Sequence, residues 1–84
     1  MIERKETKWL NIALLDHTDK TAKYTVRNKE NNVLLGIIKW FGSWRKYAFF
    51  PCSDMVFETQ CLSDITGFLN ELMEDRKNSK TKTI

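Results

Sequence analysis

The predicted fold depends mainly on the stretch VLLGIIKWFGSWRKYAFF, residues 33–50. The apolar run over residues 33–41 is typical of a central strand that is covered on much of both faces. Gly42-Ser43 suits a two-residue hairpin loop of type II′, in which glycine takes the first central position. The chain then returns as a strand over residues 44–50, and Pro51 closes it because proline cannot donate a ladder hydrogen bond. The stretch therefore predicts an antiparallel β-hairpin.

Two more strands are expected before this hairpin. LNIALL, residues 10–15, alternates at first and runs into the polar stretch DHTDKT, so it predicts a strand, with a short helix as the alternative. KYTVRN, residues 23–28, alternates cleanly and puts Tyr24 and Val26 on one face. KENN then turns the chain into the hairpin. The sequence thus predicts an antiparallel meander of about four strands.

The apolar period changes after the hairpin and becomes helical. Thr59 is the expected N-cap, and the outer face of the helix carries mainly carboxylates. We expect an α+β fold with this C-terminal helix packed on one sheet face. We also expect a single domain over residues 1–84, with an ordered core of about residues 8–76 and a flexible polar tail of about residues 77–84. The residues of the apolar stripe are Cys61, Ile65, Phe68, Leu69, Leu72 and Met73.

Strand register decides which sheet face the helix covers. A two-residue loop pairs Phe41 with Trp44, and a pairing of Asn28 with Val33 fixes the neighbouring strand. The face of Tyr24 and Val26 then receives the helix, although a slip of one residue would exchange the two faces. The residues predicted to stay on the open face are Lys23, Arg27, Ile38, Trp40, Arg45, Tyr47 and Phe49.

KWFGSWRKY, residues 39–47, combines three cationic and four aromatic side chains in nine positions. Exposed rings beside Lys or Arg are the means by which open sheets hold single-stranded nucleic acid, but such rings also anchor protein contacts. We expect a non-enzymatic interaction module that binds a protein or a second copy of itself, with nucleic acid on Trp40 and Tyr47 as the alternative. The candidate binding surface consists of Lys23, Arg27, Lys39, Trp40, Trp44, Arg45, Lys46 and Tyr47.

Composition narrows the function classes further. No apolar run reaches the roughly 18–20 residues of a membrane-spanning helix, so we expect a cytoplasmic protein with no membrane partner. The sequence lacks a glycine-rich phosphate loop, a nucleophile elbow and paired metal motifs, which predicts no enzyme activity, metal or cofactor. Residues 1–52 hold ten Lys or Arg against five Asp or Glu, and residues 53–76 hold one against six. A polyanion would therefore meet the first part of the chain.

Residues 35–68 contain three motifs, which read LGxIKW, WRxYxFxP and FxxxCLxDIxxF. This pattern resembles a group of small uncharacterised bacterial and phage-associated proteins. The resemblance covers roughly half the chain and implies a common fold without a particular activity. The matching residues are Leu35, Gly36, Ile38, Lys39, Trp40, Trp44, Arg45, Tyr47, Phe49, Pro51, Phe57, Cys61, Leu62, Asp64, Ile65 and Phe68.

Overall fold

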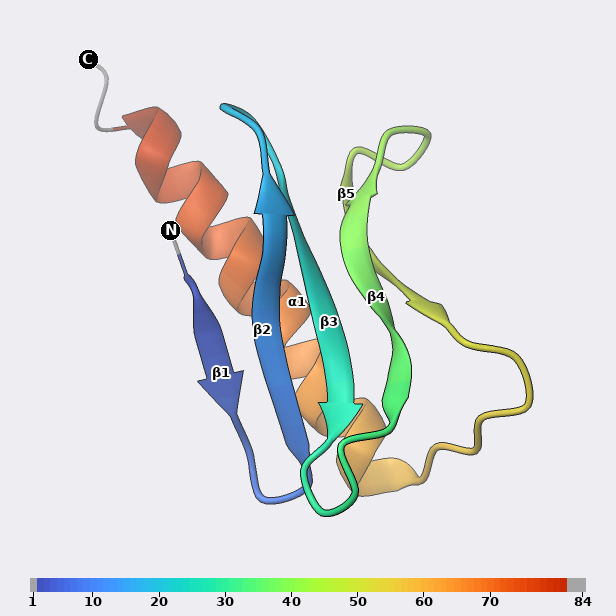
Figure 1. Cartoon of the computed structure of the whole chain (residues 1–84). Helices are drawn as coiled ribbons and strands as arrows, with labels where there is room; N and C mark the ends of the chain where they lie inside the picture. The colour runs from blue at the N-terminus through green and yellow to red at the C-terminus, as the bar shows by residue number, and fades with distance from the viewer. Residues whose placement is uncertain (1, 82–84) are drawn as a thin grey trace.

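The protein is a single antiparallel sheet with one helix across one of its faces (Figure 1). The computed structural model describes residues 2–81 and the side chains of residues 2–77. The strand order is β1-β2-β3-β4-β5, so each strand pairs with its neighbours in the chain. The α+β class, the antiparallel sheet and the C-terminal helix are confirmed, but the sheet has five strands instead of about four. The elements are β1 (Arg4–Glu6), β2 (Leu10–His17), β3 (Ala22–Asn28), β4 (Leu34–Phe41), β5 (Lys46–Pro51) and α1 (Thr59–Thr81).

β1 is the strand that the sequence did not predict. Its three residues are all charged, so they show no apolar alternation. Lys5 pairs with buried Ile12 of β2 and points toward α1, where its Nζ lies 2.9 Å from a carboxylate oxygen of Glu71. The region of residues 10–15 is a strand and not a short helix, and it continues to His17.

The core lies between α1 and the sheet face that it covers. The Tyr24 ring meets the Phe68 ring edge-on, with centroids 5.0 Å apart, and the Tyr24 hydroxyl donates to the Ile2 carbonyl at 2.6 Å. Burial, aided by the nearby Tyr47 and Asp75, raises the pKa of Tyr24 to about 12. The buried residues are Leu10, Ile12, Ala22, Tyr24, Val26, Leu35, Ile38, Tyr47, Ile65, Phe68 and Leu72.

The β4–β5 hairpin has a four-residue loop in place of the predicted two-residue loop. Phe41 pairs with Lys46, and residues 42–45 form the turn. Gly42 does not adopt the positive φ that a type II′ turn requires, whereas Arg45 has a φ of 53°. The register is therefore shifted by two residues from the prediction. Because side chains alternate with a period of two, each residue of β5 still shares a face with the expected side chains of β4.

Tyr24 and Val26 face α1 as predicted, but a bulge at Leu35 exchanges the two faces of β4 and β5 relative to β3. The Asn28 N–H bonds to the Val33 carbonyl, and Arg27 then pairs with Leu34, but Val26 pairs with Gly36. The extra residue in β4 turns the rest of that strand over relative to β3. Tyr24 consequently lies opposite Ile38, on the face that α1 covers. The prediction that the face carrying Ile38, Trp40, Tyr47 and Phe49 is open is wrong.

The start of α1 is capped by Glu58 and not by Thr59. A carboxylate oxygen of Glu58 accepts the Cys61 backbone N–H at 2.8 Å. The backbone N–H groups of Gln60 and Cys61 hold the pKa of Glu58 below its usual value. The helix runs to Thr81, so residues 77–81 of the predicted tail are helical, and residues 82–84 lie outside the described residues.

Candidate binding surface

Two of the eight predicted surface residues, Trp40 and Tyr47, belong to the helix-covered side of the sheet. Their rings meet edge-on with centroids 5.4 Å apart, and Tyr47 is only 7% exposed. The Tyr47 hydroxyl accepts the backbone N–H of Ala22 at 3.0 Å and so satisfies a buried donor. These two rings are therefore not the exposed stacking platform that the sequence predicted.

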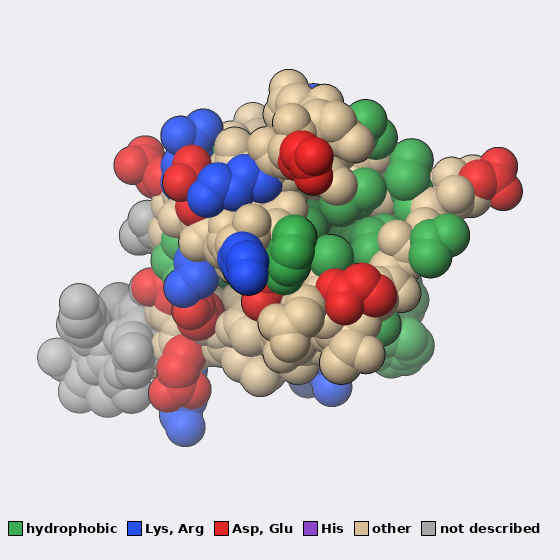
Figure 2. All heavy atoms as spheres, turned by 90° about the horizontal axis from the view of Figure 1, so that it is seen from below, with side chains coloured by type: hydrophobic (Ala, Val, Ile, Leu, Met, Phe, Trp, Pro, Cys, Tyr) green, Lys and Arg blue, Asp and Glu red, His purple; other side chains and the backbone are tan. Residues whose placement is uncertain are grey.

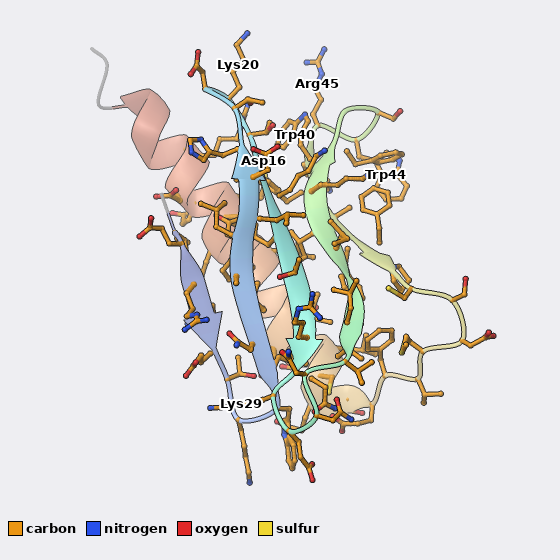
Figure 3. The ribbon with its side chains drawn as sticks, viewed as in Figure 1. Asp16, Lys20, Lys29, Trp40, Trp44 and Arg45 are labelled. Carbon is orange, nitrogen blue, oxygen red and sulfur yellow. The ribbon has the colours of Figure 1, made fainter. Side chains whose placement is uncertain are left out.

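Arg76 of α1 closes the outer side of Trp40. Its guanidinium carbon lies 4.2 Å from the centroid of the Trp40 ring, and its Nη1 donates to the carbonyl of Lys20. Figure 3 shows Trp40 between β3 and β4, near the end of the sheet where Lys20 and Arg45 lie. A cation does pair with Trp40, as the sequence suggested, but the cation comes from the helix and holds α1 to the β2–β3 hairpin.

The opposite, open face of the sheet holds other predicted residues. β3 alternates between buried Tyr24 and Val26 and outward-facing neighbours, and β4 and β5 alternate in the same way. Arg45 lies in the exposed turn and points away from the hairpin tip in Figure 3. The predicted residues on the open face are Lys23, Arg27, Lys39 and Lys46.

Three rings form a cluster on this open face, and we call Phe41, Trp44 and Phe50 the aromatic cluster. The Phe41 ring meets the Trp44 ring edge-on at 4.7 Å and the Phe50 ring at 6.0 Å between centroids. Trp44 is 66% exposed and lies beside the hairpin (Figure 3). The Lys39 ammonium lies 4.6 Å from the Phe50 centroid. Of the three rings, the predicted binding surface included only Trp44.

Charge is divided between the two sides of the molecule. Among the described strands, the open face carries five cations against two carboxylates, whereas the exposed side of α1 carries Glu71 and Glu74. Seen end-on in Figure 2, hydrophobic side chains gather on the side of β4, β5 and the segment after them, and most charged side chains lie on the side of β1. The charged residues of the open face are Arg4, Glu6, Asp16, Lys23, Arg27, Lys39 and Lys46.

The described residues contain no group of three His, Cys, Asp or Glu side chains that could hold a metal ion. Within the same residues, no helix is long and apolar enough to cross a membrane. Cys52 and Cys61 are both free and half-buried. Burial, together with the neighbouring carboxylate of Glu58, raises the pKa of the Cys61 thiol above its usual value.

Comparison with known proteins gives one informative relationship. The chain is 45% identical over 58 residues to the uncharacterized 9.3 kDa protein of Acholeplasma phage L2. The matched residues make up 69% of this chain and 74% of the phage protein. The chain belongs to the family of that phage protein. This membership agrees with the predicted group of small phage-associated proteins, while no family model and no solved structure matches the chain.

Proposed function

We propose that this protein is a non-enzymatic interaction module that binds a partner protein through the open sheet face and the β4–β5 hairpin. The observation that carries the proposal is the exposure of Trp44, 66%, at the edge of an otherwise packed aromatic cluster. Phe41 holds the Trp44 ring in place, so little rotamer freedom is lost when a partner covers it. Large rings of this kind supply most of the binding energy in protein interfaces.

The arrangement of the cluster favours a protein over stacked bases. A base needs a free ring face, but the Lys39 ammonium lies over the face of Phe50, and Phe41 makes edge contacts with both other rings. Of the three rings in the aromatic cluster, Trp44 is the exposed one. A partner that offers apolar side chains to Trp44 and carboxylates to Lys39 and Lys46 matches this surface better.

Single-stranded nucleic acid is the second candidate, and the charge of the open face supports it. Five cations against two carboxylates on one sheet face would attract phosphates, with Trp44 available to one base. Such binding would weaken steeply with salt, because phosphate contacts release counterions. Protein binding that rests mainly on Trp44 would depend on salt far less.

A pair of tryptophan variants tests the proposal. Trp44→Ala should lower the free energy of unfolding by only about 0.5–1.5 kcal/mol, since the ring is 66% exposed and loses mainly its edge contact with Phe41. Trp40→Ala should lower it by about 3 kcal/mol, because that ring packs against Tyr47 and Arg76. Urea unfolding followed by circular dichroism measures both values.

Binding is then compared between wild type, Trp44→Ala and Thr66→Ala, which lies on the exposed side of α1 and outside the open sheet face. We expect a protein captured from cell lysate to be lost with Trp44→Ala and kept with Thr66→Ala. Titration of mixed-sequence single-stranded DNA at about 150 mM salt tests the second candidate. If Trp44→Ala retains every partner of the wild type, the proposed surface is wrong.

The three motifs LGxIKW, WRxYxFxP and FxxxCLxDIxxF fit this proposal as markers of the shared fold. Gly36 admits the Phe49 ring, Trp44 belongs to the aromatic cluster, and Ile65 and Phe68 are buried in the helix stripe. A cytoplasmic location completes the proposal.

A further inference from the structure

The two edges of the sheet are built differently. β1 is three residues long, and its central Lys5 is paired with Glu71 of α1. β5 is six residues long, and its residues 47–50 are all uncharged. Within the described residues, the backbone pairing of β5 runs to β4 alone. Natural sheets shorten, charge or cover their edges, because free N–H and C=O groups pair readily with another strand. β1 follows this rule along its whole length, whereas β5 carries a Lys and a Pro only at its two ends and leaves residues 47–50 without such protection.

We propose that β5 pairs with β5 of a second copy of this chain, so that two five-stranded sheets join edge to edge in an antiparallel, two-fold dimer. This inference concerns the sheet edge and is independent of the partner proposed for the open face. A two-fold axis suits an antiparallel pair, because each strand then presents the same edge to the other. The exposed groups of β5 become a continuation of the existing ladder.

The register of this pairing follows from the two faces of the sheet. The open faces of the two sheets lie on the same side of the dimer only when even-numbered residues of β5 are opposite even-numbered residues of the second copy. A register centred on Ala48 meets this condition and pairs residues 46–50 of both copies. It puts the small Ala48 side chain on the axis, where a residue meets its own copy, and it puts Lys46 opposite Phe50 of the second copy. Because the Lys39 ammonium already lies 4.6 Å from the Phe50 centroid, Lys46 of the second copy contributes the packing of its aliphatic stem beside this ring.

The two copies of Lys46 do not repel each other strongly in this dimer. In the Ala48-centred register the two copies of Lys46 are separated by four residues along the edge, roughly 14 Å at about 3.4 Å per residue. That separation exceeds the Debye length of about 8 Å at physiological salt, so their repulsion is largely screened. The same pairing brings the Phe50 rings, and with them the two aromatic clusters, onto one continuous face.

Sedimentation equilibrium between about 1 μM and about 1 mM tests the dimer with the full chain. Ala48→Lys places two ammonium groups on the axis and should raise the dimer Kd at least about tenfold. Ala48→Glu should do the same through two carboxylates. An equimolar mixture of the two variants should restore dimerisation, because a lysine then meets a glutamate. Thr25→Lys is the matched control, with the same charge change on β3 of the open face, and should leave Kd unchanged.

A second measurement does not depend on the variants folding. Amide hydrogen exchange of Tyr47 and Phe49, whose N–H groups point away from β4, should slow in the wild type as protein concentration rises, because pairing protects these outer groups. A wild type that stays monomeric to about 1 mM overturns the proposal. A dimer that Ala48→Lys leaves intact, or that the lysine and glutamate mixture fails to restore, overturns it as well. None of these results depends on Trp44, so the proposed function is judged separately.

Discussion

Gly36→Ala should lower the free energy of unfolding by about 1–2 kcal/mol. A Cβ atom at residue 36 would lie 2.6 Å from the Cε1 and Cζ atoms of Phe49 and 2.6 Å from the carbonyl oxygen of Phe50. The Phe49 ring can tilt, but the Phe50 oxygen belongs to the backbone of β5, so the strands must move apart. Overpacking of this kind costs about 1–3 kcal/mol. The loss of glycine freedom in the unfolded chain offsets roughly 0.4–1 kcal/mol of that cost.

The other two glycines provide the controls for this prediction. Among the described residues, a Cβ at Gly42 or at Gly67 would meet no heavy atom within 4 Å apart from those of its chain neighbours and of the local helix backbone. Gly42→Ala should therefore change stability by less than about 0.5 kcal/mol. Gly67→Ala, inside α1, should raise it by about 1 kcal/mol, because alanine favours the helix.

Thermal unfolding followed by circular dichroism compares the three variants with the wild type. Each kcal/mol corresponds to roughly 4–8 °C in Tm for a domain of this size. Gly36→Ala should melt below the wild type, and Gly67→Ala should melt above it. If Gly36→Ala is as neutral as Gly42→Ala, the Phe49 ring does not cover residue 36, and the β4–β5 register derived above is wrong.

Two more predictions concern the tyrosines of the core. Tyr47→Phe should destabilise the protein by about 1–3 kcal/mol in urea unfolding, because the Ala22 N–H loses its acceptor; an unchanged midpoint would show that this N–H finds another one. Burial raises the pKa of Tyr24 from 10.0 to about 12, so Tyr24 ionises at lower pH in the unfolded chain than in the folded protein. The contribution of the neutral Tyr24 to folding stability is therefore complete below pH 10 and is lost as pH rises through about 12. Tyr24→Phe should flatten the alkaline fall in stability over that interval, and an identical pH profile for both proteins would contradict this origin.

The elements that repeat a period over many residues were predictable from the sequence. The stripe from Cys61 to Met73 defines the helix, and Ile65, Phe68 and Leu72 of that stripe are buried. The alternation of residues 23–28 and the apolar run before Gly42 define two strands. β1 was not predictable in this way, because three charged residues show neither period.

The relative phase of neighbouring strands was not predictable. Alternation divides a strand into two faces, but it does not state which face of the next strand it matches. Leu34 and Leu35 are both apolar, so the hydrophobic pattern does not reveal the bulge at Leu35. One extra residue was enough to move Trp40 and Tyr47 under α1 and to leave Phe41 and Phe50 on the open face. The sequence therefore predicted that aromatic and basic side chains lie together on the surface, but it did not predict correctly which aromatic residues these are.

The position of α1 after all five strands has a consequence for folding. Every strand pairs with its neighbour in the chain, so the contacts of the sheet are local in sequence, and such topologies form quickly. During synthesis the paired strands can leave the ribosome before the helix does. Until α1 arrives, Tyr24, Val26 and Ile38 face water on a bare apolar sheet that is prone to aggregate. Docking of α1 therefore completes the core of the nascent chain and prevents its aggregation through the exposed apolar sheet face.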